Sequence, residues 1–142
     1  MNVELLRSFL LSLPHVEETM QWGDNLVFWV GDKAIGGKMF ALANLSGGGN
    51  GVLSFAAGPE RYAELVEVEG AFPAPYMARI YWVAIERYDV FSVKELKEHL
   101  GNAHTLTYNK LPQRLKDVLA LPAKERKKLI AERRKALVKS TK

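Results

Sequence analysis

The sequence predicts a two-layer α+β domain, with helices packed on one face of an antiparallel sheet. Two apolar runs rich in β-branched and aromatic residues, at positions 26–30 and 36–42, flank the turn sequence Gly31-Asp32-Lys33. Such runs indicate paired antiparallel strands. A helical pattern precedes them, further strand signals follow, and helical patterns end the chain. This order favours helices on one side of a single sheet, which leaves the other side open.

The first expected element is an amphipathic helix near the N-terminus. Apolar side chains recur there at helical spacing, at Val3, Leu6, Phe9, Leu10 and Leu13. Asn2 is suited to cap this helix and Pro14 to end it. The acidic segment at positions 16–21 favours a loop or a short edge strand.

The middle of the chain predicts more strands and one short helix. A glycine-rich run at positions 46–51 predicts a mobile hairpin loop, and positions 52–56 predict the third strand. Gly58-Pro59 begins a short helix, and positions 70–76 are expected to be irregular or extended. The next strand is expected at positions 80–85, with Ile80, Trp82 and Ala84 on one face and Tyr81, Val83 and Ile85 on the other.

Helices are expected to complete the domain. Ser92-Val93-Lys94-Glu95 fits a capping box, and the buried face of that helix continues through Leu96, Leu100 and Ala103. Gly101-Asn102 weakens the pattern, and positions 105–111 are ambiguous. Pro112 opens a short helix, and positions 123–138 form a basic helix with a narrow apolar stripe of Leu129, Ile130 and Leu137.

The chain divides by charge into a domain at residues 1–121 and a basic helix or tail at residues 122–142. The tail holds nine Lys and Arg side chains and two Glu side chains, a net charge of +7, whereas residues 1–121 carry −3. The net charge of +4 therefore does not describe a basic globular surface. The tail helix has three alternatives: docking on the domain, pairing with another chain, or lying on an anionic surface. A frayed, solvated terminus without function is an equally good interpretation.

Composition places the chain among globular proteins. Its 142 residues are 48% apolar and 25% charged, enough for one core without disulfides, and no cysteine is present. Glu4 and Arg7 interrupt the first apolar pattern, so we expect no secretory signal. No run approaches the roughly 18 apolar residues of a spanning helix. We therefore expect a cytoplasmic protein without membrane contact.

Several short motifs, in their order, resemble the MmcQ/YjbR family over about residues 1–121. They are Leu13-Pro14 followed by acidic residues, Trp22-Gly23, Gly37-Lys38-Met39-Phe40-Ala41, Gly58-Pro59-Glu60, Tyr81-Trp82-Val83 and Leu111-Pro112. The resemblance implies a CyaY-like (frataxin-like) fold. It also implies DNA binding, with a proposed double-wing mode.

Two departures limit what the resemblance implies. Phe55-Ala56-Ala57 stands in the third strand, where many members carry a basic residue, so a phosphate contact is absent there. The first helix offers only Glu4, whereas frataxins carry an acidic ridge for iron. A hard cation needs several oxygen ligands, so iron binding is not expected.

DNA binding requires cations that reach phosphates, and for single strands also flat side chains on which bases stack. The candidates are Lys33 and Lys38 near the first hairpin, Arg61 on the short helix, Arg79 and Tyr81 on the fourth strand, and Arg87 after it. Lys33 and Lys38 would suit a wing that enters a groove. The alternative is that these cations lie at the edge of the sheet, keep it soluble and prevent edge-to-edge pairing with other sheets. The nine cations of the tail are expected to add affinity for DNA that does not depend on sequence, by displacing counterions.

Aromatic residues support a second hypothesis, a protein or small-ligand interaction module that uses the open face of the sheet. Trp22, Trp29 and Trp82 supply possible aromatic surface. Because side chains alternate along a strand, we expect Phe28 to be exposed if Trp29 is buried. Trp22 lies outside the strand pattern and is the better candidate for a pocket.

The sequence offers no catalytic motif, metal site or cofactor site, so we expect a protein that is not an enzyme. His99 and His104 are five residues apart, which is out of register for one helix face, and His15 is isolated. Glu17 and Glu18 diverge as neighbours, and no serine lies in a nucleophile elbow. The glycine-rich run lacks the Gly-Lys-Ser/Thr ending of a phosphate loop.

Overall fold

Within residues 1–46 and 49–140, which the computed structural model describes, six strands form one antiparallel sheet. The strands lie in the order β1 (Val16–Gln21), β2 (Asn25–Val30), β3 (Lys38–Asn44), β4 (Leu53–Ala56), β6 (Trp82–Ile85) and β5 (Ala71–Pro73). The expected pairing of the two central apolar runs is confirmed as the β2–β3 pair. The expected hairpin loop at 46–51 includes Gly47 and Gly48, which lie outside the described residues.

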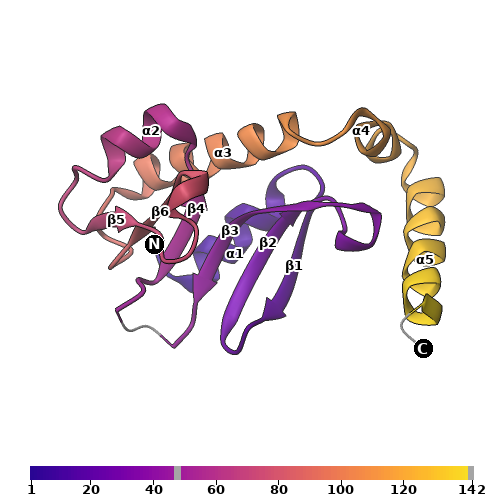
Figure 1. Ribbon diagram of the computed structural model, residues 1–142, viewed down its shortest axis with the longest axis horizontal. Coiled ribbons are helices and arrows are strands. Elements are labelled where there is room, and N and C mark those ends of the chain that lie inside the picture. Colours follow the sequence, from indigo (N-terminus) through magenta and orange to yellow (C-terminus); the bar gives the residue numbers. More distant parts are fainter. Residues whose placement is uncertain (47–48, 141–142) are drawn as a thin grey trace.

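Helices precede, interrupt and follow the strands. They are α1 (Val3–Ser12), η1 (Lys33–Ile35), α2 (Gly58–Leu65), η2 (Ala78–Ile80), α3 (Val93–Asn109), α4 (Gln113–Leu119) and α5 (Ala123–Ser140), where η denotes a 3-10 helix. α1 and α3 lie against the same face of the sheet, and α4 and α5 continue from α3 toward the β1 edge (Figure 1). The expected α+β class is confirmed.

The helix caps follow the side chains that the sequence provides. The Asn2 side chain accepts a hydrogen bond from the Leu5 amide at 2.9 Å and starts α1. Ser92 and Glu95 form the expected capping box at the start of α3. α3 then continues through Gly101 to Asn109, so positions 105–109 are helical. Burial of one side of α3 on the sheet outweighs the weak helix propensity of glycine.

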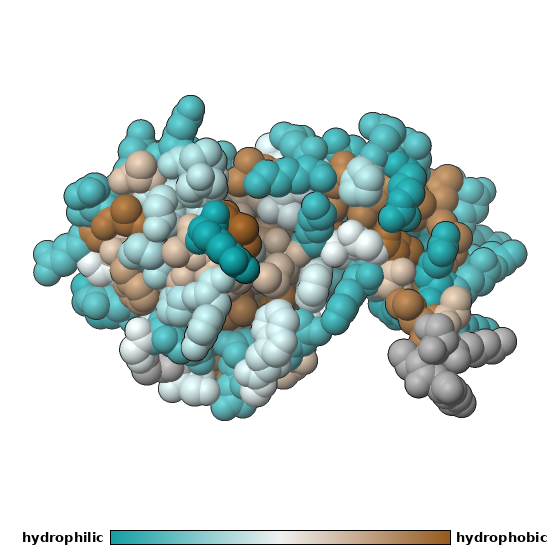
Figure 2. Space-filling view, viewed as in Figure 1, coloured by the Kyte–Doolittle hydropathy of each residue, from teal (hydrophilic) through white to brown (hydrophobic). Residues whose placement is uncertain are grey.

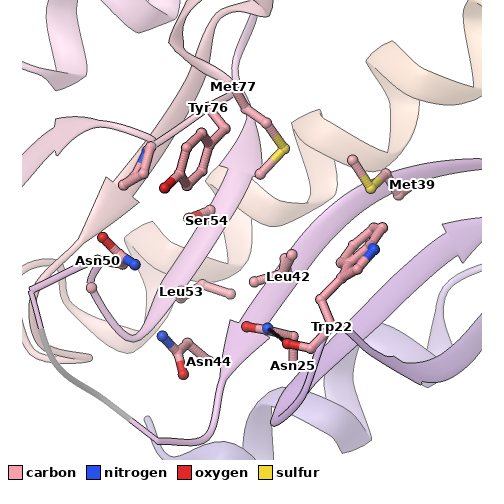
Figure 3. Close-up of a pocket in the computed structure, with 12 residues that line it drawn as sticks. Trp22, Asn25, Met39, Leu42, Asn44, Asn50, Leu53, Ser54, Tyr76 and Met77 are labelled. Atoms are coloured by element: carbon pink, nitrogen blue, oxygen red, sulfur yellow. Dashed lines mark hydrogen bonds between the residues drawn. The ribbon is translucent and has the colours of Figure 1, made fainter.

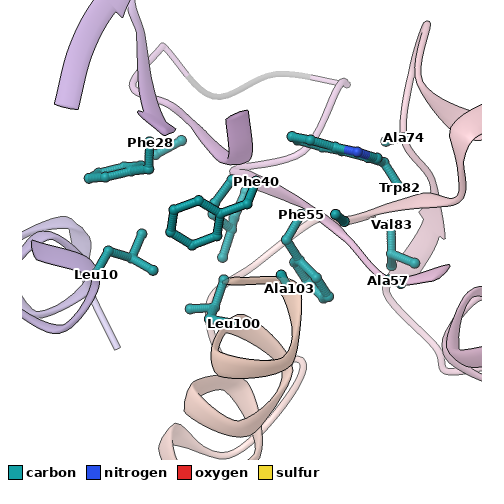
Figure 4. Close-up of a cluster of buried hydrophobic side chains, with 14 of the residues drawn as sticks. Leu10, Phe28, Phe40, Phe55, Ala57, Ala74, Trp82, Val83, Leu100 and Ala103 are labelled. Carbon is teal, nitrogen blue, oxygen red and sulfur yellow. The ribbon is translucent and has the colours of Figure 1, made fainter. Parts of the chain in front are cut away.

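The hydrophobic core lies between the sheet and the two helices α1 and α3. Phe28 of β2, Phe40 of β3 and Phe55 of β4 are fully buried, next to Leu10 of α1 and Leu100 of α3 (Figure 4). Alternation along the strands places their neighbours on the opposite face of the sheet. We call this opposite face the outer face; it carries Val27, Trp29, Leu42 and Ser54.

The expectation that burial of Trp29 would expose Phe28 is wrong, because both side chains are buried. Trp29 lies on the outer face, where its indole N–H donates to the Thr19 hydroxyl at 2.8 Å. The Lys33 ammonium group lies 5.6 Å from the centre of the same ring. Side chains from β1 and η1 therefore cover Trp29 on the face opposite the helices.

The strand predicted at positions 80–85 is shorter in the structure, because it begins two residues later. Ile80 ends the 3-10 helix η2, and Tyr81 follows in the left-handed backbone region with φ 63°. β6 begins at Trp82, where pairing with Ala56 of β4 starts. The alternation expected for Ile80 and Tyr81 therefore does not apply, whereas it holds from Trp82 onward.

The basic tail forms the helix α5, which packs on the domain beside η1. Ile130 contacts the core, and Arg134 donates a hydrogen bond to the buried carboxylate of Asp32. Arg126 donates to the carbonyl oxygens of Leu119 and Leu121. Docking is thus the alternative that the structure shows. Leu137 is 51% exposed, so the expected apolar stripe is only partly buried.

Candidate functional site

The sheet register brings most of the predicted cations to one end of the sheet. β3 starts with Lys38, and η1, which carries Lys33, directly precedes it. Ala41 of β3 pairs with Phe55 of β4, and Ala56 pairs with Trp82 of β6, so η2 with Arg79 lies at the same end. α2 begins just after β4, which adds Arg61. We call this the basic end of the sheet.

Two further arginines join the basic end from the C-terminal helices. Arg114 of α4 and Arg133 of α5 line a small pocket of about 210 Å³ together with Gly36, which follows η1. Among the described residues, no carboxylate lies within 4.0 Å of Lys38, Arg79, Arg114 or Arg133. Neither arginine was predictable from local sequence, because only the docking of α4 and α5 brings them beside η1.

Acidic side chains gather at the opposite end, where β2, β4 and α3 begin and β6 ends. They include Asp24, Glu67, Glu69, Glu86, Asp89 and Glu95. The basic end also holds acidic side chains. Asp32 there is bonded to Arg134, and the cations of this end outnumber the remaining acids, Glu17, Glu60 and Asp117. The domain is therefore polarised along its strands, which the sum of charges conceals.

Arg87 does not belong to the basic end. It follows β6 at the acidic end, and its guanidinium group forms ion pairs with Glu86 and with Asp89, the latter at 3.0 Å. These hydrogen bonds, chiefly the one to Asp89, raise the pKa of Arg87. Arg87 was expected as a candidate after the fourth strand; it follows Ile85 at the end of β6, whereas Lys33 and Lys38 lie at the end where β6 begins.

Arg61 and Tyr81 lie at the basic end but contact other side chains. Arg61 donates to the His99 Nδ1 atom at 3.1 Å, so it reaches back toward α3. Burial, and then the charge of Arg61, lower the pKa of His99. Tyr81 packs edge-on against Tyr62 of α2, with ring centres 5.7 Å apart, and is 42% exposed. Both residues are less available for a ligand than Lys38 and Arg79.

The three tryptophans have different surroundings. Trp29 is covered as described above, and Trp82 is 4% exposed beside Ala74 (Figure 4). Trp22, in the turn between β1 and β2, is 65% exposed. Of the three predicted tryptophans, Trp22 is therefore the one whose ring is accessible to a ligand.

Trp22 lines a pocket of about 430 Å³ on the outer face of the sheet. Met39 and Trp22 stand on one side of this pocket, Tyr76 and Met77 on the other, with Leu42, Leu53 and Ser54 between them (Figure 3). Asn25, Asn44 and Asn50 lie along its margin. Apolar and weakly polar surface lies in the middle of the face in view, with one strongly hydrophilic side chain over it and others around it (Figure 2). We call this cavity the outer-face pocket.

Both exposed aromatic side chains of the outer-face pocket have unusual backbone conformations. Trp22 has φ 49° and Tyr76 has φ 67°. Tyr76 follows Pro75 in a turn closed by a 3.1 Å hydrogen bond from the Met77 amide to the Ala74 carbonyl. Proline followed by a residue with positive φ defines a type II turn, where glycine is the preferred second residue. Each bulky residue in this region costs about 1–2 kcal/mol.

The histidines are structural in their contacts. His104 is buried, packs against Phe40, and hydrogen-bonds the Pro14 carbonyl through Nε2 at 2.8 Å. His99 lies against Phe91 with ring centres 4.7 Å apart. Burial lowers the pKa of His15, and the charge of Arg126 lowers it further. No group of three or more His, Asp or Glu side chains suited to a metal occurs in the part of the chain that the structure describes.

A family model called YjbR matches residues 11–106, which is more than half of the chain. The chain belongs to the YjbR family. The resemblance drawn from the sequence motifs is thereby confirmed. No curated protein matches the chain.

Two solved structures are similar to this YjbR protein. Protein DR2400 of Deinococcus radiodurans, which carries the DUF419 domain, aligns with a TM-score of 0.73 and 28% identity, over 85% of this chain and 89% of that one. A Pseudomonas syringae protein aligns with a TM-score of 0.59 and 21% identity, over 75% of this chain and 99% of that one. The second likeness concerns the fold alone.

The family match covers the outer-face pocket but not the last two helices. Residues 11–106 include β1 through β6 and most of α3, so Trp22, Lys38 and Tyr76 lie inside the YjbR region. α4 and α5, which carry Arg114, Arg133 and Arg134, follow it. Among the described helices, none is both long and apolar enough to cross a bilayer.

Proposed function

We propose that this YjbR protein binds nucleic acid, with phosphate groups held at the basic end of the sheet and without catalysis. The carrying observation is the charge polarity: cations from η1, β3, η2, α4 and α5 gather at one end, while acidic side chains gather at the other. Phosphates are attracted to exposed cations that have no carboxylate partner, because contact releases the counterions of the nucleic acid. Lys38, Arg79, Arg114 and Arg133 meet this description.

The proposal extends to fold and location. The helices α1 and α3 on one face of an antiparallel sheet support a CyaY-like assignment. The double-wing mode has less support, because Asp32 in the first hairpin tip is held by Arg134 and Lys33 lies over Trp29. A cytoplasmic protein fits this proposal, since nucleic acid is available there.

The test measures the DNA affinity of two variants in which uncharged glutamine replaces cations. Affinity is measured by fluorescence anisotropy with labelled single-stranded and duplex DNA. Lys38→Gln with Arg114→Gln removes two cations from the basic end, and Lys94→Gln with Lys97→Gln removes two exposed cations from the first turns of α3 as the matched control. We expect the double variant to bind roughly tenfold or more weakly and its salt dependence to fall by about 2 in log–log slope. An equal loss of DNA affinity in the control variant would contradict a site localised at the basic end.

A second function, an interaction module for a protein or small ligand, is favoured by one observation. The residues that line the outer-face pocket include no charged side chain; Leu42 and Leu53 lie in its middle, and Met39 and Met77 stand on its sides. Apolar pockets with a few polar groups are typical of ligand sites. Binding there would depend little on salt, which separates it from phosphate binding at the basic end.

A further inference from the structure

We propose that the outer-face pocket holds an unpaired base of single-stranded nucleic acid, stacked on Trp22 and Tyr76. This inference deepens the proposed function and rests on it. It assigns the base to the outer-face pocket and the neighbouring phosphates to the basic end. The two sites meet at η2, because Arg79 follows Met77 of the pocket lining by two residues. Lys38 precedes Met39 at the same end of β3, but its side chain starts toward the other face of the sheet, as does that of its cross-strand partner Val30.

The first argument is the exposure of the two rings. Tyr76 is 96% exposed and Trp22 is 65% exposed, although large aromatic side chains normally gain stability by burial. Both occupy backbone conformations that disfavour bulky residues. The Tyr76 side chain buries almost no surface in the free protein and Trp22 leaves most of its surface exposed, and both border the same cavity. Aromatic rings held in this way provide stacking surfaces for bases.

The second argument is the chemistry of the lining. A base is flat and uncharged, and its edges carry hydrogen-bond donors and acceptors. Asn25 and Asn50 carry both kinds of group, and the Ser54 hydroxyl lies between the two aromatic walls (Figure 3). The lining has no carboxylate to repel a phosphate chain. The volume of about 430 Å³ lies in the usual range for small-ligand sites.

The third argument is the surrounding charge, which favours a nucleic-acid strand over an apolar peptide. An apolar side chain would also fit between Leu42 and Leu53, but it would make no use of Arg79, which follows Met77 of the lining by two residues. A strand that places a base in the cavity can bring a neighbouring phosphate to Arg79 and the next ones to the basic end. A duplex cannot do so, because its bases are paired and stacked. The inference therefore predicts a preference for single strands.

The experiment compares a short thymidine oligonucleotide with an abasic strand of the same length, because the two share their phosphates and differ only in bases. We expect the wild-type protein to bind the base-bearing strand at least about fivefold more tightly, the effect of one base–aromatic contact. Tyr76→Gly and Trp22→Asn should abolish this difference, since glycine and asparagine accept positive φ and keep the turns intact. Trp22→Phe should retain it.

A matched control separates stacking from relief of backbone strain. His15 also has a positive φ of 63° but does not line the outer-face pocket. His15→Asn should therefore leave the preference for the base-bearing strand unchanged. An equal preference in wild type for both strands, or a full preference in Tyr76→Gly, would overturn the inference.

The outcomes also distinguish failure of the inference from failure of the proposed function. If the protein binds the base-bearing and the abasic strand equally, and Lys38→Gln with Arg114→Gln lowers the affinity for both, the result supports phosphate binding and contradicts the base site. If no strand binds but thymidine shifts the Trp22 indole N–H signal in NMR spectra, the base site stands and the proposed function fails. A shift with an apolar tetrapeptide and none with thymidine assigns the cavity to a protein partner and overturns the inference.

Discussion

Arg134 in the last helix donates a hydrogen bond to the carboxylate of Asp32, which lies 102 residues earlier in the chain. The Asp32 side chain is 7% exposed, whereas Arg134 is 62% exposed. The other carboxylate oxygen of Asp32 accepts from the Ala34 amide at 2.8 Å and caps η1. The basic tail is thus anchored through the turn that presents Lys33.

Loss of the Arg134 partner should destabilise the protein. Arg134→Met leaves the buried Asp32 carboxylate with the Ala34 amide as its main protein partner, so we expect the free energy of unfolding to fall by about 1–3 kcal/mol. The measurement is urea unfolding followed by circular dichroism. Lys135→Met, an exposed neighbour on α5, is the control and should change stability little. Equal effects of both variants would show that Arg134 and Asp32 do not interact in solution.

Removal of residues 122–142 should have two separable effects. The truncated protein loses Ile130 from the edge of the core and the Arg134–Asp32 bond, which predicts a loss of roughly 2–4 kcal/mol in stability. It also loses Arg133 and a net charge of +7, so its salt slope for DNA binding should flatten. Unfolding curves and anisotropy titrations of the same sample report both. Unchanged affinity in a folded truncation would exclude the tail from binding.

The strain at Tyr76 predicts an unusual response to mutation. Tyr76→Gly places glycine where a type II turn prefers it and removes a side chain that is almost fully exposed. Relief of strain offsets the greater freedom of glycine in the unfolded chain, so stability should stay the same or rise by up to about 1 kcal/mol. Thermal unfolding checks this result. A drop of more than about 1 kcal/mol would mean that Tyr76 packs against the domain.

The histidines predict a loss of stability in mild acid. Burial lowers the pKa of His99 and of His15 below the ordinary value of 6.5. As the pH falls below 6.5, these histidines bind protons in the unfolded chain but remain neutral in the folded protein. The free energy of unfolding therefore decreases as the pH is lowered, until the pH reaches the lower pKa values of the folded state. Denaturant titrations across this range measure the slope.

A variant at Arg61 tests the cause of the shift at His99. Arg61→Gln removes a cation whose charge contributes to the lowered pKa, so the NMR titration midpoint of His99 should rise toward 6.5. Lys97→Gln, an exposed cation elsewhere on α3, serves as the comparison. An unchanged midpoint in Arg61→Gln would attribute the shift to burial alone.

Much of the fold follows from local sequence patterns. The Asn2 cap, the Ser92 capping box and the β2–β3 pairing depend on residues close together in the chain, and all three were predictable. The tertiary contacts were less predictable from the sequence. Phe28 is buried under the helices, and Trp29 is also buried because Thr19 and Lys33 cover its ring on the outer face, which alternation alone does not reveal.

The candidate site was predictable only in part. Trp22 was expected to lie outside the strands and Lys38 near the first hairpin, and both are so placed. Tyr76 was missed, because a bulky residue rarely takes the left-handed conformation; the preceding Pro75 is the one local signal of its turn. Arg114 and Arg133 were missed because helix docking, not spacing, brings them to η1.

The most direct test of the account is an amide NMR map of the protein titrated with single-stranded DNA. The account predicts that signals from residues 33–39, 76–81 and 114 shift together with the Trp22 indole, and that those shifts diminish with salt. Signals from residues 86–95 at the acidic end should stay in place. Shifts confined to the acidic end or to α1, with residues 33–39 unaffected, would contradict binding at the basic end.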